Sequence, residues 1–179
     1  MIQIPRYQYV LAACLATAIS ACSDGSNTPV GSPGNGNSYQ TEQVPGAQRQ
    51  ALTVYKSPTC GCCGEWIGHI EQQGFVATVA HPEDLNTIKR QYQIAPVLQS
   101  CHTAVTDAGY VFEGHVPARY MRQFLDNPPA DAVGLSVPGM PVGSPGMEVG
   151  ERFMPYQVLL LKKDGSVEVY AEVASAAQQ

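Results

Sequence analysis

Three cysteines within four residues constrain this chain more than any other feature. They lie in residues 59–64, Thr-Cys-Gly-Cys-Cys-Gly. Residues 52–55 before them are rich in β-formers and predict a buried strand. After them, apolar side chains recur at helical spacing from Cys63 to Ile70, and Gly74 is typical of a residue just past a helix. We therefore expect the cysteines at a helix N-terminus, where backbone amides and the helix dipole stabilise a thiolate.

The spacing of these cysteines is compatible with more than one chemistry. Cys60 and Cys63 form a C-x-x-C pair, and Cys62 is a third sulfur inside it. Reversible dithiol exchange, in which Cys60 attacks and Cys63 resolves, fits the pair, and so does binding of a soft metal. A structural disulfide in an exported protein is the simpler alternative, although three sulfurs cannot all pair among themselves.

Residues 1–21 are expected to be a lipoprotein signal peptide. Arg6 supplies a positive charge, and residues 10–19 are an apolar run too short to span a bilayer. The run ends in Ile19-Ser20-Ala21-Cys22, which resembles a bacterial lipobox, so Cys22 is the expected lipidation site. An ordinary secretory signal is the alternative. Both place the domain outside the cytoplasm, and Ser23 after the cysteine favours an outer-membrane anchor on the periplasmic side.

The remaining chain divides by composition. Residues 22–50 are polar and rich in glycine, which predicts a flexible tether. Residues 51–173 suffice for one domain with one core, and residues 174–179 are expected to be a frayed tail. The whole chain has 10 Lys and Arg against 15 Asp and Glu, a formal net charge of −5, without a basic cluster. This argues against a nucleic-acid partner.

Patterning within the domain predicts an α/β fold. Residues 75–79 predict a second strand, parallel to the first. A helix is expected to begin at Pro82, with Leu85, Ile88 and Tyr92 on its buried face and Lys89 and Arg90 in its last turn. Residues 103–113 predict one hairpin and residues 155–170 a second.

Two further segments complete the expected domain. A helix with Met121, Phe124 and Leu125 inward should end before Pro128. Residues 135–150 predict a long irregular loop rich in glycine, proline and methionine. The outline is that of a single thioredoxin-like domain with an additional hairpin and this loop. In that fold a cis-proline precedes the strand facing the C-x-x-C, and Met154-Pro155 is the candidate.

Four separated motifs resemble one bacterial family. They are residues 55–66, Ser100-Cys101-His102-Thr103, Glu113-Gly114-His115-Val116-Pro117 and residues 137–148. They are similar to the CGCC-motif proteins described as a domain of unknown function, which include the CopG-type copper-resistance proteins. The resemblance extends over about residues 52–170. It implies a periplasmic thioredoxin-like protein that binds one or more copper ions through clustered cysteines and interconverts Cu(I) and Cu(II) in copper resistance.

The resemblance and the donor chemistry together indicate the ligands. Thiolate and thioether are soft donors that favour Cu(I), while imidazole serves both Cu(I) and Cu(II). The expected metal ligands are Cys60, Cys62, Cys63, Cys101, His102, His115, Met140 and Met147. Cys101 has an alternative role as the disulfide partner of Cys62. Cys60 and Cys63 are also the expected redox-active, catalytic pair.

The remaining candidate side chains are assigned to structure. His102 and His115 are expected to be exposed at element edges. His69 follows Cys62 by seven residues, about 10.5 Å along a helix, and is left out of the site. His81 is expected to be a helix-start residue, and Met121, Met154 and Trp66 to be packing residues.

Other functions stay open from the sequence alone. A metal-independent thiol–disulfide oxidoreductase and a passive copper chaperone or sponge use the same cysteines. Structural zinc would leave the methionine loop without a role. The expected partners are copper ions and periplasmic copper-efflux or chaperone proteins, and membrane contact is expected through the lipid anchor alone.

Overall fold

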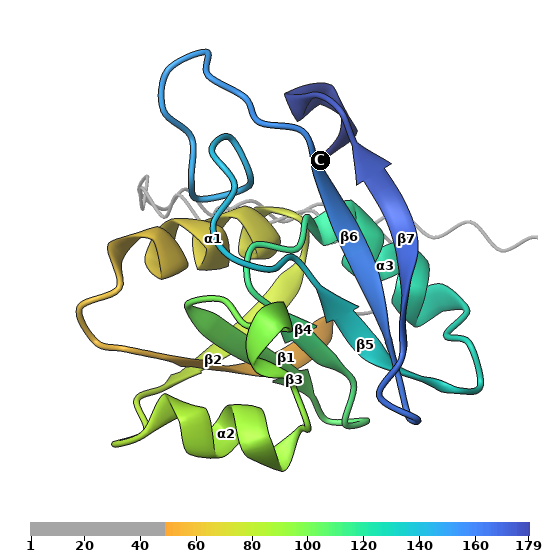
Figure 1. Ribbon diagram of the computed structural model, residues 1–179. Helices are drawn as coiled ribbons and strands as arrows, with labels where there is room; N and C mark the ends of the chain where they lie inside the picture. The colour runs from red at the N-terminus through yellow and green to blue at the C-terminus, as the bar shows by residue number, and fades with distance from the viewer. Residues whose placement is uncertain (1–48) are drawn as a thin grey trace, which may run out of the picture. The chain divides into compact units, whose positions relative to one another are not determined.

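A computed structural model describes residues 49–179 of the protein, which form a mixed α/β domain (Figure 1). The expected signal peptide, the lipidation site Cys22 and all but the end of the expected tether lie outside the described residues. The elements, in chain order, are β1 (Gln50–Lys56), α1 (Gly61–Gln72), β2 (Phe75–Ala80), α2 (Leu85–Gln91), η1 (Pro96–Leu98), β3 (His102–Thr106), β4 (Val111–Glu113), α3 (Ala118–Asp126), β5 (Ala132–Ser136), β6 (Tyr156–Lys162), β7 (Val167–Val173) and η2 (Ala176–Gln178).

The seven strands form one sheet in the order β2-β1-β3-β4-β5-β6-β7. β1 and β2 are parallel and are joined by α1, as the spacing of the first motif predicts. β3 lies antiparallel beside β1 and pairs with β4 as a hairpin, so the predicted 103–113 hairpin is part of the central sheet. β4 and β5 are parallel, and the β6–β7 hairpin extends the sheet as expected.

Alternation along the strands divides the hydrophobic core between the two faces of the sheet. Leu52 and Val54 of β1 face the larger core, which also holds Trp66 of α1 and Phe124 of α3. The smaller core contains Val105 of β3 with neighbours that include Tyr92, just after α2. α1 and α2 accordingly lie on opposite sides of the sheet (Figure 1). Among residues 49–179, no helix is long and apolar enough to cross a bilayer.

The second helix differs from its prediction. α2 begins at Leu85, because the Asp84 side chain accepts a hydrogen bond from the Asn86 amide at 2.9 Å and caps the helix. Pro82 lies before this cap. The buried residue of α2 is Lys89, which was predicted only as a favourable cation in the last turn, whereas the expected inward residues are only half-buried.

Three other predictions, all for the C-terminal part of the chain, differ from the structure. The peptide bonds of the described residues are all trans, so the predicted cis-proline at Pro155 is wrong. The first two residues of the expected loop, Leu135 and Ser136, belong to β5. The expected frayed tail contains η2, and the Gln179 amide donates to the Gly143 carbonyl at 2.7 Å, which ties the tail to the loop.

A histidine from α1 caps the start of α3. His69 Nε2 accepts a hydrogen bond from the Ala118 amide, at 3.1 Å, and Ala118 is the first residue of α3. This bond requires an unprotonated Nε2. Burial lowers the pKa of His69 from its usual 6.5, against an opposing effect of Glu148.

Acid should therefore weaken the fold through His69. With its pKa lower in the folded than in the unfolded protein, the stabilisation is complete above about pH 6.5 and is lost as the pH falls below that value. We expect His69→Gln, which cannot titrate, to lose less stability than wild type between neutral and acidic pH. Urea unfolding at both pH values measures the difference. Identical pH dependence in the two proteins would contradict the capping role.

Candidate metal centre

The first turn of α1 carries three sulfurs. Cys60 and Cys63 are joined by a disulfide, with their Cα atoms 5.5 Å apart, and Cys62 Sγ lies 3.6 Å from Cys60 Sγ. Cys60 is the N-cap residue, and no side chain caps the first turn, so the helix dipole at this end is directed at the sulfurs. The pair that the sequence predicted to be redox-active is in its oxidised form.

Cys101 brings a fourth sulfur to this turn from a distant part of the chain. Its Sγ lies 3.5 Å from Cys63 Sγ. The register of β1 with β3 explains the approach, because Lys56 pairs with His102 and the residues just beyond each strand end are then neighbours. The Sγ atoms of Cys60, Cys62, Cys63 and Cys101 all lie within 4.8 Å of one another. We call this set the sulfur cluster.

Two imidazoles approach Cys101 from its other side. His115 Nε2 lies 3.1 Å and His102 Nδ1 3.4 Å from Cys101 Sγ. His115 Nδ1 donates to the Pro145 carbonyl at 2.7 Å, because a carbonyl can only accept, and Nε2 is left with its lone pair towards the sulfur. Cys101 therefore belongs both to the sulfur cluster and to a Cys101–His102–His115 group.

The two imidazoles are completely buried, which corrects the expectation that they are exposed at element edges. Trp66 explains part of this burial, since its ring lies 4.3 Å from that of His102, between centroids. The indole Nε1 donates to the Val116 carbonyl at 2.9 Å, so Trp66 packs beside the site as predicted. His102 Nε2 is a buried nitrogen without a hydrogen-bond partner among the described residues.

Burial keeps the site uncharged. It lowers the pKa of His102 well below 6.5, helped by the nearby His115, and it lowers the pKa of His115 as well. Burial and the neighbouring Cys62 raise the pKa of the Cys101 thiol to about 11. Neutral imidazoles offer lone pairs to a metal, whereas Cys101 must lose a proton to become a thiolate ligand. A cation that binds here would therefore displace a proton.

The loop after β5 lies against the sulfur cluster. Gly146 has a φ of +82°, and a Cβ at this position would lie 2.6 Å from the Cys62 carbonyl oxygen. Only glycine allows this contact with the first turn of α1. Met147 follows it and is half-buried, while Met140 is 51 % exposed in the same loop. The loop that carries both thioethers thus contacts the site.

The remaining candidates are placed elsewhere. His69 and His81 are engaged with the Ala118 amide and with the Lys56 carbonyl, in keeping with their exclusion from the site. Met121 is buried in the core, as predicted. Met154 is 56 % exposed, so its assignment to packing was wrong.

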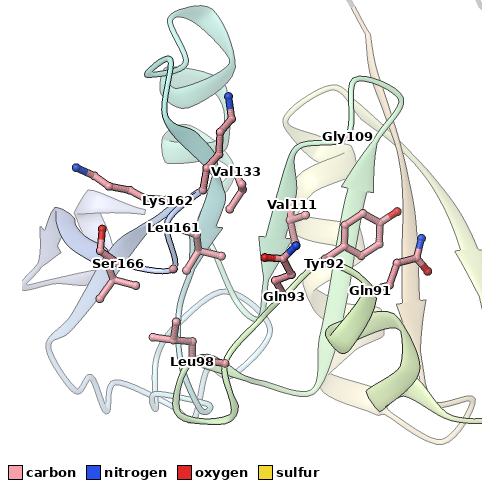
Figure 2. Close-up of a pocket in the computed structure, with 14 residues that line it drawn as sticks. Gln91, Tyr92, Gln93, Leu98, Gly109, Val111, Val133, Leu161, Lys162 and Ser166 are labelled. Atoms are coloured by element: carbon pink, nitrogen blue, oxygen red, sulfur yellow. The ribbon is translucent and has the colours of Figure 1, made fainter.

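A hollow of about 420 Å³ lies on the other face of the sheet, next to α2 (Figure 2). Tyr92, Leu98 and Val111 form part of its wall, and Lys162 lies at its margin. No cysteine, histidine or methionine is among its lining residues. It therefore offers no soft donor and is not a second candidate for the metal centre.

Comparison with known proteins identifies the family. Two solved structures, of copper resistance protein CopG in its form 2 and in its form 1, are each 43 % identical to the chain. Both cover 70 % of this chain, with 99 % and 98 % of their own length and TM-scores of 0.67 and 0.66. The protein belongs to the CopG-type copper-resistance family.

Two other comparisons complete this result. The family described as "Protein of unknown function, DUF411" matches residues 98–147, which include Cys101, both buried histidines and the two loop methionines. No curated protein gives a significant match. The resemblance stated from the four sequence motifs is thereby confirmed.

The CopG-type site fits a copper ion on its own chemistry. Its donors are thiol sulfur and neutral imidazole nitrogen, which are the ligand types that copper prefers, and carboxylates are absent from both described ligand groups. His102 Nε2 is buried without a partner, and the hydrogen bond to Pro145 leaves the lone pair of His115 Nε2 towards Cys101, so each imidazole has a ring nitrogen available to a metal.

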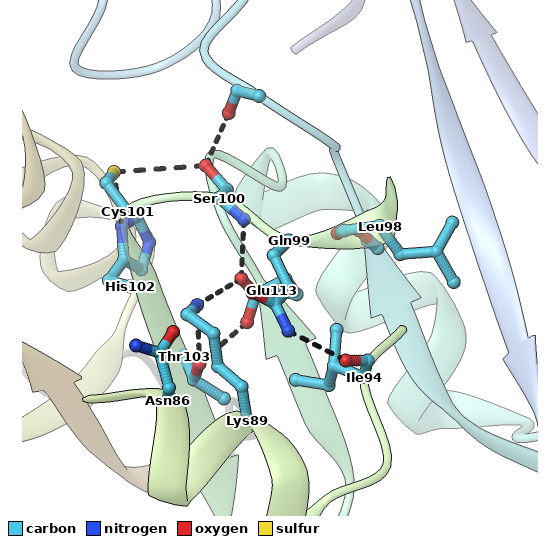
Figure 3. Close-up of polar contacts among 12 residues, drawn as sticks. Asn86, Lys89, Ile94, Leu98, Gln99, Ser100, Cys101, His102, Thr103 and Glu113 are labelled. Carbon is cyan, nitrogen blue, oxygen red and sulfur yellow. Dashed lines mark hydrogen bonds and ion pairs between the residues drawn. The ribbon is translucent and has the colours of Figure 1, made fainter. Parts of the chain in front are cut away.

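The polar groups that support this site were not predicted from the sequence. Glu113 lies in one of the four motifs but was given no role there, and Lys89 was expected at a helix end. In the structure both are buried and form an ion pair beneath the segment that carries Cys101 and His102 (Figure 3). The signal available in the sequence was a glutamate in an otherwise apolar strand, Tyr-Val-Phe-Glu.

Proposed function

We propose that the protein binds copper through the sulfur cluster and its two imidazoles, and that it interconverts Cu(I) and Cu(II) in copper resistance. The position of Cys101 carries this proposal. Its sulfur lies within 3.5 Å of Cys63 Sγ and within 3.4 Å of both histidine nitrogens. One thiolate can thus join a sulfur-rich environment that favours Cu(I) to an imidazole environment that also accepts Cu(II).

The proposed ligands are those expected from the sequence. Cys60, Cys62, Cys63 and Cys101 supply thiolates, and His102 and His115 supply imidazoles. Met140 and Met147 are proposed as thioether ligands from the loop that contacts α1. Thiolates this close together can bridge metal ions, so the site is proposed to hold one or more copper ions.

The disulfide supplies a balanced redox step. In the reduced protein, the thiols of Cys60 and Cys63 release their two protons to solvent, and the resulting thiolates each give up one electron and form the S–S bond. Two Cu(II) ions each accept one of these electrons and become Cu(I). In the reverse step two Cu(I) ions each give one electron to the disulfide, which opens to two thiolates that take up protons from solvent. Copper is the substrate of both directions.

Anaerobic addition of Cu(II) to the fully reduced protein tests this step. We expect the Cu(II) electron paramagnetic resonance signal to disappear as two Cu(I) ions, measured with a chromogenic chelator, form for each disulfide. Cys60→Ser/Cys62→Ser/Cys63→Ser, which leaves one thiol in the sulfur cluster and so cannot form a disulfide within it, should retain the Cu(II) signal. Reduction of Cu(II) without loss of the Cys60 and Cys63 thiols would refute the proposed electron source.

Metal-independent thiol–disulfide exchange is the second candidate, favoured by the Cys60–Cys63 disulfide at the start of a helix. Cys62, 3.6 Å from Cys60, argues against it because a third sulfur diverts mixed disulfides. Insulin reduction by the metal-free protein would support this candidate. A passive copper sponge differs from both, since the copper it binds would keep one valence through cycles of oxidation and reduction.

We infer a thioredoxin-like core for the domain. The order β1-α1-β2, the antiparallel β3–β4 hairpin and α3, with the C-x-x-C at the start of α1, support this inference. A periplasmic location with a lipid anchor at Cys22, an outer-membrane site for it, and copper-efflux or chaperone proteins as partners are part of the same proposal. They rest on the signal-like N-terminal sequence and on the family.

A further inference from the structure

A buried carboxylate contacts both ends of the four-residue segment 100–103 (Figure 3). Glu113 Oε1 accepts a hydrogen bond from the Ser100 amide at 2.6 Å. Its Oε2 accepts a hydrogen bond from the Thr103 hydroxyl, also at 2.6 Å. Cys101 and His102 are the two residues between these contacts, so one side chain fixes the segment that carries both of them.

Lys89 completes this arrangement from α2. Its Nζ forms an ion pair with Glu113 Oε1 and donates to Thr103 Oγ1 at 3.2 Å. The side chains of Lys89 and Glu113 are 4 % and 0 % exposed. Taking two charges out of water costs free energy that an apolar pair of similar volume would not. Stability alone therefore does not explain an ion pair at this position.

Ser100 extends the same network to the methionine loop. While its amide is held by Glu113, its hydroxyl donates to the carbonyl of Gly139, the residue before Met140 (Figure 3). The Gly139 amide in turn donates to the Gln99 carbonyl at 3.1 Å. These hydrogen bonds connect the methionine loop to the start of segment 100–103, next to the Glu113 carboxylate.

We propose that Glu113 is a positioning residue of the copper site, whose carboxylate holds Ser100 and Thr103 and thereby fixes Cys101 and His102 against the sulfur cluster. This inference rests on the proposed function. Lys89 neutralises the carboxylate and orients it. Neither residue is a proposed copper ligand. Glu113 belongs to neither group of possible metal ligands among the described residues, and the Lys89 ammonium and the Glu113 carboxylate are engaged with each other and with Thr103 (Figure 3).

Two double variants of equal charge test the inference. Lys89→Met/Glu113→Gln keeps an oxygen that can accept the Ser100 amide, whereas Lys89→Met/Glu113→Leu has no acceptor. Neither buries an unpaired charge. The readout is the alkylation rate of Cys101 by iodoacetamide in the metal-free oxidised protein, resolved from that of Cys62 by peptide mass spectrometry. Cys62, the other free thiol among residues 49–179, serves as the internal reference.

The expected result separates the two variants. The leucine variant should alkylate at Cys101 about tenfold faster than wild type, as expected for loss of hydrogen bonds to a charged group. The glutamine variant should stay within about twofold, and Cys62 should be unaffected in both. After copper loading, the thiolate-to-copper absorption bands should change in the leucine variant and be retained in the glutamine variant.

Two other outcomes would overturn the positioning role of Glu113. Equal Cys101 rates in wild type and both variants would overturn the positioning role, and so would equal acceleration of Cys62. If the leucine variant does not fold, Thr103→Val takes its place, with an expected acceleration of about threefold at Cys101 alone; an unchanged rate there overturns the inference. The alkylation assay needs no copper. If the wild-type protein bound no copper, the proposed function would be refuted, but the alkylation rates would still test whether Glu113 positions Cys101.

Discussion

Replacing Cys101 with serine is expected to weaken Cu(I) binding by at least about 100-fold, because even groups that only support a ligand contribute 10- to 100-fold. Cys101 is the sulfur common to the sulfur cluster and the two-histidine group, so its loss affects both. The domain should still fold, since Cys101 lies at the half-buried edge before β3 rather than in the core. Anaerobic competition with a Cu(I) chelator measures the affinity.

Met154→Leu is the matched control for this variant. It also removes one sulfur, but from a side chain that is 56 % exposed and outside the proposed ligand set. Its Cu(I) affinity should equal that of wild type. Thermal unfolding of the metal-free proteins shows whether either variant has lost structure. A folded Cys101→Ser protein with wild-type Cu(I) affinity would show that copper binds without the shared sulfur.

Lys89→Met is expected to destabilise the metal-free protein by about 3–5 kcal/mol at neutral pH. The variant leaves the Glu113 carboxylate completely buried without its counter-charge. The cost is the desolvation of an unpaired charge rather than the energy of one contact. Adding Glu113→Gln should recover most of the loss, because the double variant buries no charge. Urea unfolding measures both differences.

The destabilisation should also depend on pH. Burial raises the pKa of Glu113, against the opposing effects of Lys89 and the hydrogen-bond donors. A carboxyl with a raised pKa takes up a proton on folding, so stability falls as the pH rises from the ordinary value of 4.5 through the folded value. Removing Lys89 raises that pKa further, and Lys89→Met should therefore lose less stability in acid than at neutral pH.

Lys162→Met is the control for the loss of a lysine ion pair. Lys162 pairs with Asp131 and Glu168, whose side chains are 60 % and 62 % exposed. Exposed pairs contribute little to stability. Its melting temperature should stay close to that of wild type. If Lys89→Met and Lys162→Met unfold alike, the burial of the Lys89–Glu113 pair has no energetic consequence.

Sequence patterns predicted correctly those elements whose structure depends on residues close together in the chain. The apolar spacing from Cys63 to Ile70 and the glycine at position 74 predict α1 and its end, and α1 ends at Gln72, one residue before the C-cap. The turn at Asp164-Gly165 predicts the β6–β7 hairpin in the same way. Local propensity and periodicity determine such elements.

The errors arose where distant groups decide the outcome. Lys89 looks like a helix-end cation until Glu113, from β4, is placed opposite it. His102 looks exposed until Trp66 covers it from α1. The start of α2 is a local exception, since Asp84 caps the Asn86 amide two residues on where Pro82 looked like the first helical residue. The role of Cys101 came from resemblance to a family, because no local pattern shows that β3 brings it to Cys63.

Anomalous diffraction at the copper edge, from crystals of the copper-loaded protein, tests the central claim most directly. The account predicts a copper peak within bonding distance of Cys101 Sγ and of at least one sulfur from the first turn of α1. Copper bound only at surface carboxylates or at His81, with Cys101 uncoordinated, would contradict it.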